Sequence, residues 1–211
     1  LFPYTTLFRS EDIAPGTYAW IIPKGKDIAN VGTGVRAPFM KRGMTIRDYQ
    51  RNFVKNHPLT AEKLKNAVPT AVKAGNIPVG GPIEHTTTDN VLVVGDAGGH
   101  TIPTVGGGIP PGLIIGKIAG EAAAAKINRG ASLSSFDDAW KEQMGDVLYT
   151  SLRLRRMSDV VFKSKRMIDI VTKLDWLTKD TISKFIYCKM DAKMKVMERA
   201  LQSGEIQKLL K

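Results

Sequence analysis

The chain has one cysteine, Cys188, among its 211 residues, so it cannot form an internal disulfide, and a reducing compartment is indicated. No stretch reaches the roughly 18 uninterrupted apolar residues that a helix needs to cross a bilayer. The three histidines, His57, His85 and His100, stand far apart and lack the spacing of metal ligands. The sequence therefore excludes a disulfide scaffold and predicts neither a membrane-spanning helix nor a metal site.

Acidic residues are few beside basic ones: 31 Lys and Arg face 20 Asp and Glu, which gives a net charge of +11. Residues 150–211 hold 15 of the basic and 7 of the acidic residues, so most of the excess lies there. Basic residues interleaved with apolar ones, as in 152–157, can lie against anionic lipid, and a solvated basic face is the alternative. No recognition motif accompanies the charge, so nucleic-acid binding is not expected.

A glycine-rich segment follows a short apolar run at residues 91–109. Val91–Val94 is apolar at every position, which predicts a strand covered on both faces of a sheet. Asp96 follows the predicted strand, where its carboxylate can accept hydrogen bonds from sugar hydroxyls. Three consecutive glycines, 106–108, let backbone N–H groups approach a ligand, and the next helix directs its positive end toward the same place. The combination favours a nucleotide cofactor over a purely structural turn.

The helix after these glycines begins with Pro110 and Pro111, which suit a first helical turn because its donors have no helical partner. Gly112, Gly116 and Gly120 recur at every fourth position, so a sheet or a cofactor could pack closely on that face. Lys117 and Glu121 interrupt the apolar run and argue against a membrane-dimerising face.

This segment resembles the second flavin-contacting motif of FAD-dependent oxidoreductases with the fold of para-hydroxybenzoate hydroxylase. The resemblance implies that FAD is the cofactor, that Asp96 holds its ribityl or ribose hydroxyls, and that Gly95 belongs to the same cofactor-binding motif. It places Pro103 beside the flavin ring, and the ring's N1/C2 edge against Gly106, Gly107, Gly108 and Ile109. Many members have Ala-Ala-Gly where this chain has Ala97-Gly98-Gly99. His100, in the same loop, is expected to be a hydrogen-bonding residue rather than a proton donor.

A second stretch, residues 18–25, resembles the Tyr-x-Trp-x-Phe-Pro-Lys-Gly signature of geranylgeranyl reductases, with Ile22 in place of Phe. Alternation alone predicts a strand over Thr17–Pro23, a hairpin connection, and a second strand over Ile28–Val35. Two aromatics in an ordinary sheet core are the alternative to a ligand site here. The resemblance implies a wall of the lipid-substrate cavity, formed by Tyr18, Trp20, Pro23, Lys24 and Gly25.

Residues 1–10 match the translation of a common sequencing-adapter oligonucleotide and are therefore set aside from the fold as an artefact. No Gly-x-Gly-x-x-Gly opens a helix after a strand, so the main pyrophosphate site of a dinucleotide-binding domain is not found in this sequence. We therefore expect the C-terminal half of a longer protein, and a chain that does not bind FAD tightly by itself.

The predicted fold class is α+β, the C-terminal half of a para-hydroxybenzoate-hydroxylase-like FAD-binding fold. Residues 11–84 are expected to form part of a substrate domain, with helices over 45–56 and 61–66 and a strand near Ile77. Residues 85–130 would supply the last strand and helix of the FAD domain. Residues 131–211 are helical by pattern, with helices starting near Ser135, Arg166, Thr181 and Ala192. Cys188 falls in one of these patterns and is predicted to be a packing residue.

The resemblance implies a flavin-dependent reductase that saturates the carbon–carbon double bonds of geranylgeranyl chains in archaeal-type polyprenyl lipids. Its electron donor, NADPH, ferredoxin or another, stays open. We expect a cytoplasmic protein, with peripheral contact to the inner face of the membrane. Two alternatives remain: another flavoprotein of the superfamily, a monooxygenase or a quinone-linked dehydrogenase, or a non-catalytic, basic protein that binds lipid surfaces.

Overall fold

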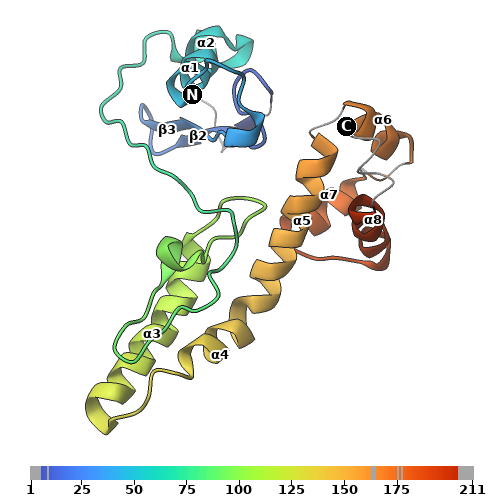
Figure 1. Cartoon of the computed structure of the whole chain (residues 1–211). Helices are drawn as coiled ribbons and strands as arrows, with labels where there is room; N and C mark the ends of the chain where they lie inside the picture. Colours follow the sequence, from blue (N-terminus) through green and yellow to red (C-terminus); the bar gives the residue numbers. More distant parts are fainter. Residues whose placement is uncertain (1–5, 9, 163–164, 175, 177, 204–211) are drawn as a thin grey trace. The chain divides into compact units, whose positions relative to one another are not determined.

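The computed structural model describes residues 6–8, 10–162, 165–174, 176 and 178–203. Within these ranges the chain forms two compact units, residues 1–74 and 75–211 (Figure 1). The predicted boundary lay at residue 84, ten residues further along. Each unit is described here by itself.

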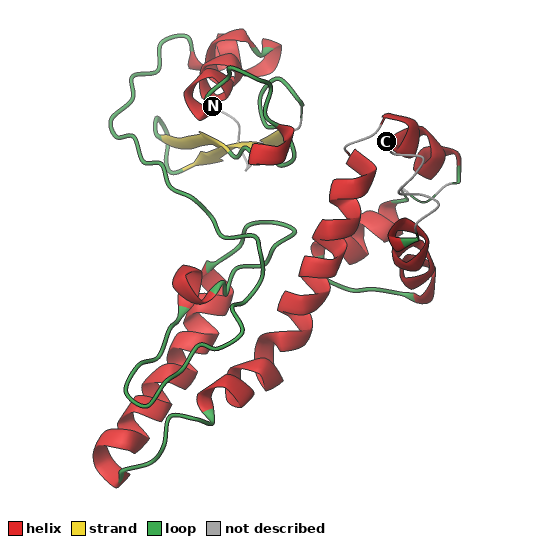
Figure 2. Cartoon of the chain, viewed as in Figure 1, coloured by secondary structure: helices red, strands yellow, loops and turns green. Residues whose placement is uncertain are grey.

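Unit 1 combines a small antiparallel sheet with helices, as Figure 2 shows. Its strands lie in the order β1 (Thr6–Phe8), β2 (Ala19–Pro23) and β3 (Ala29–Thr33). The predicted hairpin joins β2 to β3, with Pro23 opposite Ala29 and Trp20 opposite Gly32. Strand alternation then places Ala19 and Ile21 on the buried face, and Trp20 and Ile22 on the other.

The residues set aside as an artefact include β1, which pairs with β2 through Leu7 and Trp20. Phe8 is 8% exposed and lies 5.1 Å from Phe53 between ring centroids. Excluding residues 1–10 from the fold was therefore wrong for Thr6–Phe8, because an apolar side chain at alternate positions lets this segment complete the sheet and its core. Residues 1–5 and 9 lie outside the described ranges, and the adapter origin stays a prediction.

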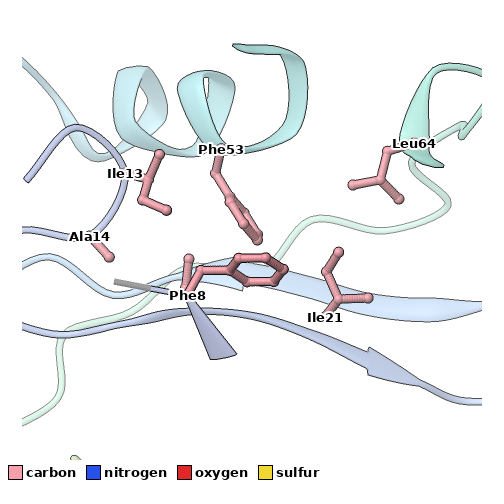
Figure 3. Close-up of a cluster of buried hydrophobic side chains, with 7 residues drawn as sticks. Phe8, Ile13, Ala14, Ile21, Phe53 and Leu64 are labelled. Atoms are coloured by element: carbon pink, nitrogen blue, oxygen red, sulfur yellow. The ribbon is translucent and has the colours of Figure 1, made fainter. Parts of the chain in front are cut away.

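Helices cover the buried face of this sheet. Thr45 precedes α1 (Ile46–Arg51), and its backbone N–H and hydroxyl both donate to the Asp48 carboxylate, at 2.8 and 2.7 Å, which caps the start of the helix. A π-helical turn, η2 (Asn52–Asn56), and α2 (Pro58–Leu64) continue from α1. Figure 3 shows Phe53 pointing down from η2 onto Phe8 and Ile21 of the sheet. The remaining members of this core are Ile13, Ala14, Ala19 and Leu64.

Unit 2 is helical, with a loop-rich entry. Its first long helix is α3 (Ile109–Arg129), preceded by a short 3-10 turn, η3 (Gly95–Gly98). The later elements are α4 (Phe136–Trp140), the π-helical turn η4 (Lys141–Gly145), α5 (Asp146–Phe162), α6 (Lys165–Lys173), α7 (Lys179–Ile186) and α8 (Ala192–Gln202). The helices predicted from the sequence are thus confirmed, with shifts of a few residues at their ends.

Two apolar clusters hold this unit together. In the first, α3 packs on α4, η4 and the start of α5; its buried members are Ile115, Ile118, Ala119, Phe136, Trp140, Met144 and Leu148. In the second, the far end of α5 packs against α6 and α8; its buried members are Leu154, Met157, Val161, Met167, Val171, Met194 and Leu201. Periodic apolar residues on each helix explain both clusters.

Unit 1 combines a sheet with helices and unit 2 is helical, so the predicted α+β class is confirmed.

Two predicted strands are wrong. Val91–Val94 is extended but joins only an isolated bridge, Thr87 to Leu92, and Val91 is 53% exposed. Ile77 lies in a segment without regular structure and is 57% exposed. A strand needs a neighbouring segment that shares its backbone hydrogen bonds. Within the described residues of unit 2, residues 91–93 form backbone hydrogen bonds only with residues 86–88, so no sheet is formed.

Candidate cofactor and substrate sites

The predicted cofactor residues form one continuous loop, residues 95–108, which we call the Asp96 loop. It starts in η3, where Gly95 has a φ of +69°, and ends at Gly108, the cap of α3. Its far limb folds back on itself, because Ile102 N–H donates to Gly107 O at 3.0 Å and Gly106 N–H donates to Ile102 O at 2.8 Å. Gly106 has a φ of +68°, which a residue with a side chain adopts only under strain.

Asp96 and the helix start lie together. Thr101 donates its hydroxyl to Asp96 Oδ1 at 2.8 Å, and a Cβ at Gly108 would lie 3.0 Å from the same oxygen. Asp96 itself is exposed, whereas Thr101 is fully buried. Thr101 therefore fixes the carboxylate while leaving its second oxygen available, and glycine at 108 keeps the space beside it open.

A hollow of about 430 Å³ opens at this point, lined by Ile77, Asp96, Gly106, Gly108, Ile109, Gly112 and Leu113. Its size falls within the usual range for small-molecule sites, and its lining is mainly apolar around one carboxylate. Pro110 and Pro111 occupy the first turn of α3 as predicted, and neither has an N–H. Hydrogen bonding to a ligand at this helix end therefore falls to Gly108 and Ile109 alone, supported by the helix dipole.

Contacts from distant segments support the Asp96 loop on its buried side. Ser151 on α5 is fully buried, accepts a hydrogen bond from Thr104 N–H at 3.0 Å, and lies 2.9 Å from the Thr104 hydroxyl. A Cβ on Gly99 would lie 2.2 Å from Gly81 O, so residues 81 and 99 touch backbone to backbone. Pro103 is buried, within the loop rather than facing solvent. These contacts come from distant segments, so the linear motif carries no sign of them.

Two residues near the loop differ from expectation. Both ring nitrogens of His100 are buried and find no hydrogen-bond partner among the described residues, so the predicted hydrogen-bonding role is wrong. Its imidazole instead packs against Trp140, with ring centroids 4.7 Å apart and the ring planes tilted by 55°. Burial lowers the pKa of His100 against the opposing effect of Asp137. Cys188 is a buried packing residue as predicted, but it lies just beyond α7, with a φ of +54° and its Sγ 3.8 Å from Thr104 Oγ1.

Asp137 of α4 organises the polar contacts beside Trp140. It accepts hydrogen bonds from the Thr86 N–H at 3.1 Å and from the Thr86 hydroxyl, and the Trp140 indole N–H donates to it at 3.3 Å. Burial alone would raise the pKa of Asp137, but these donors together hold that pKa below its ordinary value. The segment before the loop is thereby tied to α4.

The predicted substrate residues belong to unit 1, whereas the Asp96 loop belongs to unit 2. Trp20 donates its indole N–H to Asn30 Oδ1 at 2.6 Å, and its ring lies across Gly32, where a Cβ would approach Cζ2 to 2.3 Å. The Tyr18 and Trp20 rings meet edge to face at 6.0 Å. Pro23 ends β2, and Lys24 and Gly25 are exposed in the hairpin turn. The structure thus gathers Tyr18 and Trp20 into one aromatic surface on the half-buried face of the sheet.

Comparison with known proteins assigns both regions to one family. Residues 3–75 match the family model of the geranylgeranyl reductase catalytic domain. The digeranylgeranylglycerophospholipid reductase of Methanocaldococcus jannaschii is 43% identical over 71% of this chain and 38% of its own length. The corresponding reductase 2 of Methanopyrus kandleri is 37% identical over 72% of this chain and 39% of its own. The chain is therefore similar to members of the geranylgeranyl reductase family, and it spans about 40% of the length of these relatives.

A solved structure shares the fold. It is described as a geranylgeranyl bacteriochlorophyll reductase-like protein from Thermoplasma acidophilum, and it superposes with a TM-score of 0.68 at 23% identity. The match covers all of this chain and 51% of that one. Among the described helices, even the 21-residue α3 lacks the combination of length and hydropathy that a bilayer crossing requires.

Proposed function

We propose that this chain supplies the ribityl- and ring-binding side of an FAD site, and a wall of the lipid cavity, in a reductase that saturates geranylgeranyl chains of archaeal-type lipids. The observation that carries the proposal is the cradle formed by Asp96, Thr101 and Gly108 at the start of α3. A carboxylate held by one hydroxyl, beside a position without a Cβ, fits a polyhydroxyl chain that approaches the backbone closely.

Within this proposal each residue has a definite task. Asp96 accepts hydrogen bonds from ribityl hydroxyls, while Gly108 and Ile109 direct N–H groups and the positive end of α3 toward the carbonyl edge of the ring. When bound, reduced FAD would supply a hydride to an isolated double bond, and a proton would complete the saturation. Trp20 and Tyr18 present flat apolar surfaces that hold the prenyl chain and exclude water from it. The residues of this chain would orient the cofactor and the prenyl chain, exclude water and stabilise charge, whereas the redox chemistry belongs to the cofactor.

A chimera tests the proposal. The matched segment of the Methanocaldococcus jannaschii reductase would be replaced by this chain's residues, and the purified protein examined for bound flavin and for reduction of digeranylgeranyl lipid. NADPH and reduced ferredoxin would each be tried as the electron donor. Mass spectrometry should show steps of about two daltons for each double bond saturated, since each saturation adds two hydrogens. A chimera that retains flavin but leaves the lipid unchanged would point to another flavoenzyme.

Asp96→Asn in the chimera should weaken FAD binding about 10- to 100-fold, because one charged acceptor of hydrogen bonds is lost. Asp89→Asn is the matched control, since Asp89 is exposed in the turn before residue 91 and outside the loop. Equal flavin retention in both variants would contradict the role given to Asp96. A folded chimera without any flavin would overturn the cofactor proposal itself.

The structure corrects the expectation that residues 152–157 face lipid, because Leu152, Leu154 and Met157 are buried. We propose instead that a later part of the basic C-terminal region contacts anionic lipid at the membrane surface. Ile182 and Ile186 of α7 are 49% and 53% exposed, and Tyr187, just after α7, is 71% exposed. Lys179 and Lys189 flank them. Apolar side chains bordered by lysines suit an interface between headgroups and acyl chains. In a flotation assay the chain should bind anionic vesicles. This binding should weaken when the salt concentration is raised, and also in the variant Ile182→Ser with Ile186→Ser. Salt-independent binding, or equal binding to neutral vesicles, would count against this surface.

A further inference from the structure

His100 is an unusual residue at the back of the Asp96 loop. It is fully buried, yet neither of its ring nitrogens has a hydrogen-bond partner among the described residues. Buried polar atoms without partners are rare in folded proteins and call for an explanation. Only the neutral imidazole tolerates such a site, because a buried charge without a partner costs several times more than an uncharged polar group.

The backbone around His100 is shaped to admit it. A Cβ on Gly98 would lie 2.7 Å from the imidazole Cε1, so alanine at position 98 would collide with the ring. Gly98 and His100 therefore form a matched pair, with Trp140 closing the other side of the imidazole at 4.7 Å.

His100 is linked to Asp96 over a short path. Its own N–H donates to Gly95 O at 3.0 Å, which closes the η3 turn that carries Asp96. The next residue, Thr101, donates to Asp96 Oδ1 at 2.8 Å. A movement of the imidazole that carries the His100 backbone with it would therefore disturb the η3 turn and the hydroxyl that orients the carboxylate.

Few charged groups face the imidazole. On α4, Asp137 already accepts hydrogen bonds from Thr86 and Trp140. The amino group of Lys141, the first residue of η4, lies over the Trp140 ring, 5.6 Å from its centroid. In the loop itself, Asp96 is engaged by Thr101.

The charged side chains at residues 84–85, before the loop, and at residues 117 and 121 on α3 face solvent. The side chains of Glu84 and His85 are 89% and 78% exposed, and those of Lys117 and Glu121 on α3 are 78% and 67% exposed. A protonated His100 thus has one nearby carboxylate, Asp137, whose hydrogen-bonding capacity is largely committed. Burial opposes the charge more strongly than Asp137 favours it.

We propose that His100 is a positioning residue for the Asp96 loop and holds it only while the imidazole is uncharged, so that acidification loosens the loop. Folding then favours the neutral form, and this contribution is complete above the pKa of the unfolded histidine, about 6.5. It declines as the pH falls below that value. The consequence for the cofactor, weaker retention in acid, rests on the proposed function, whereas the opening of the loop does not.

Hydrogen exchange on the 211-residue chain tests the opening without any cofactor. Exchange in peptides covering 95–108 would be compared at about pH 5.5 and about pH 7.5, on either side of the ordinary histidine pKa, after correction for intrinsic rates. In the wild type, protection of these amides from exchange should be several-fold lower at the lower pH. In His100→Phe, which keeps an aromatic ring against Trp140, protection should be the same at both pH values. His85→Phe, at an exposed histidine, should behave as the wild type. An equal acid loss in His100→Phe would overturn the proposal.

Two further measurements keep the test decisive if His100→Phe does not fold. NMR of labelled histidine should show that protonation of His100 and loss of loop protection share one midpoint, and different midpoints would refute the link. Gly98→Ala should raise hydrogen exchange in residues 95–108 several-fold when His100 is present. It should cause no further increase in exchange when His100 is also replaced by Ala. Flavin retention in the chimera tests the cofactor proposal separately, so failure of one is distinguishable from failure of the other.

Discussion

Trp20 owes its orientation to two residues on the neighbouring strand. Asn30 accepts its indole N–H, and Gly32, directly opposite in the register, leaves the space over which the ring lies. A cross-strand glycine under an aromatic ring is a packing feature that depends on the absence of one carbon atom. The Tyr-x-Trp segment can present a flat aromatic surface only because β3 supplies both neighbours.

Gly32→Ala should therefore displace Trp20. The new Cβ would lie 2.3 Å from Cζ2, so the indole must swing away and give up its bond to Asn30. We expect unit 1 to lose about 1–3 kcal/mol of stability, as for other overpacked sites. Tryptophan emission and urea unfolding of the chain measure both effects. Gly75→Ala is the control, since a Cβ there meets nothing within 4 Å; identical emission from the two variants would contradict the packing described.

At the scale of elements, α8 is tied to α5 by one ion pair. Arg153 donates through Nε to Glu198 at 2.8 Å and through a second nitrogen to the other carboxylate oxygen, a bidentate arrangement. Glu198 is 8% exposed. The hydrogen bonds from Arg153, opposed by burial, hold the pKa of Glu198 below its ordinary value of 4.5. The pair therefore stabilises α8 on the bundle chiefly while Glu198 is ionised.

Glu198→Gln should release α8 at neutral pH, with a loss of about 1–3 kcal/mol in the free energy of unfolding of unit 2. Because the folded pKa lies below the unfolded one, the wild-type advantage is complete above about pH 4.5 and disappears as the pH falls through the folded value. The two proteins should therefore converge in acid. Urea unfolding at neutral pH and in acid measures the difference in stability between the two proteins. Glu62→Gln is the control, because its partner Lys65 is 59% exposed. A difference that persists in strong acid would refute the ionic explanation.

Helices were predictable from the sequence, whereas strands of unit 2 were not. Apolar periodicity and the Thr45–Asp48 cap depend on neighbouring residues, so α1, α3, α5 and α8 could be placed within a few positions. A strand depends on partners elsewhere, and the apolar run at residues 91–94 has only one short bridge among the described residues. Periodicity reports which side chains are apolar but not which segment pairs with them.

The candidate site divides in the same way. Asp96, Gly106 and Gly108 could be predicted because the loop that presents them is continuous in sequence. Ile77, which lines the hollow, and Ser151, which braces Thr104, come from segments 20 to 50 residues away and carry no motif. The state of His100 was predicted incorrectly, because a lack of hydrogen-bond partners is a property of the folded surroundings.

On the scale of the whole molecule, the stretch between the two units has neither regular structure nor buried side chains. Residues 65–77 are all exposed, and the division falls after Ala74. Each unit has its own apolar core, around Phe53 in one and around Trp140 in the other. Separate cores joined by an exposed segment are the usual mark of parts that unfold independently.

Limited trypsin treatment should therefore cut first at Lys73, because exposed and irregular backbone fits a protease while helices do not. Both products should survive and unfold in separate transitions, since no core residue of one unit is taken from the other. Glu84 offers a sharper comparison: its side chain is 89% exposed, but Ile83 N–H is bonded to Gly98 O and Thr86 N–H to Asp137. A glutamate-specific protease should accordingly be slow at Glu84. Rapid cleavage there would place the boundary near residue 84, inside the segment that the Asp96 loop and α4 hold in place.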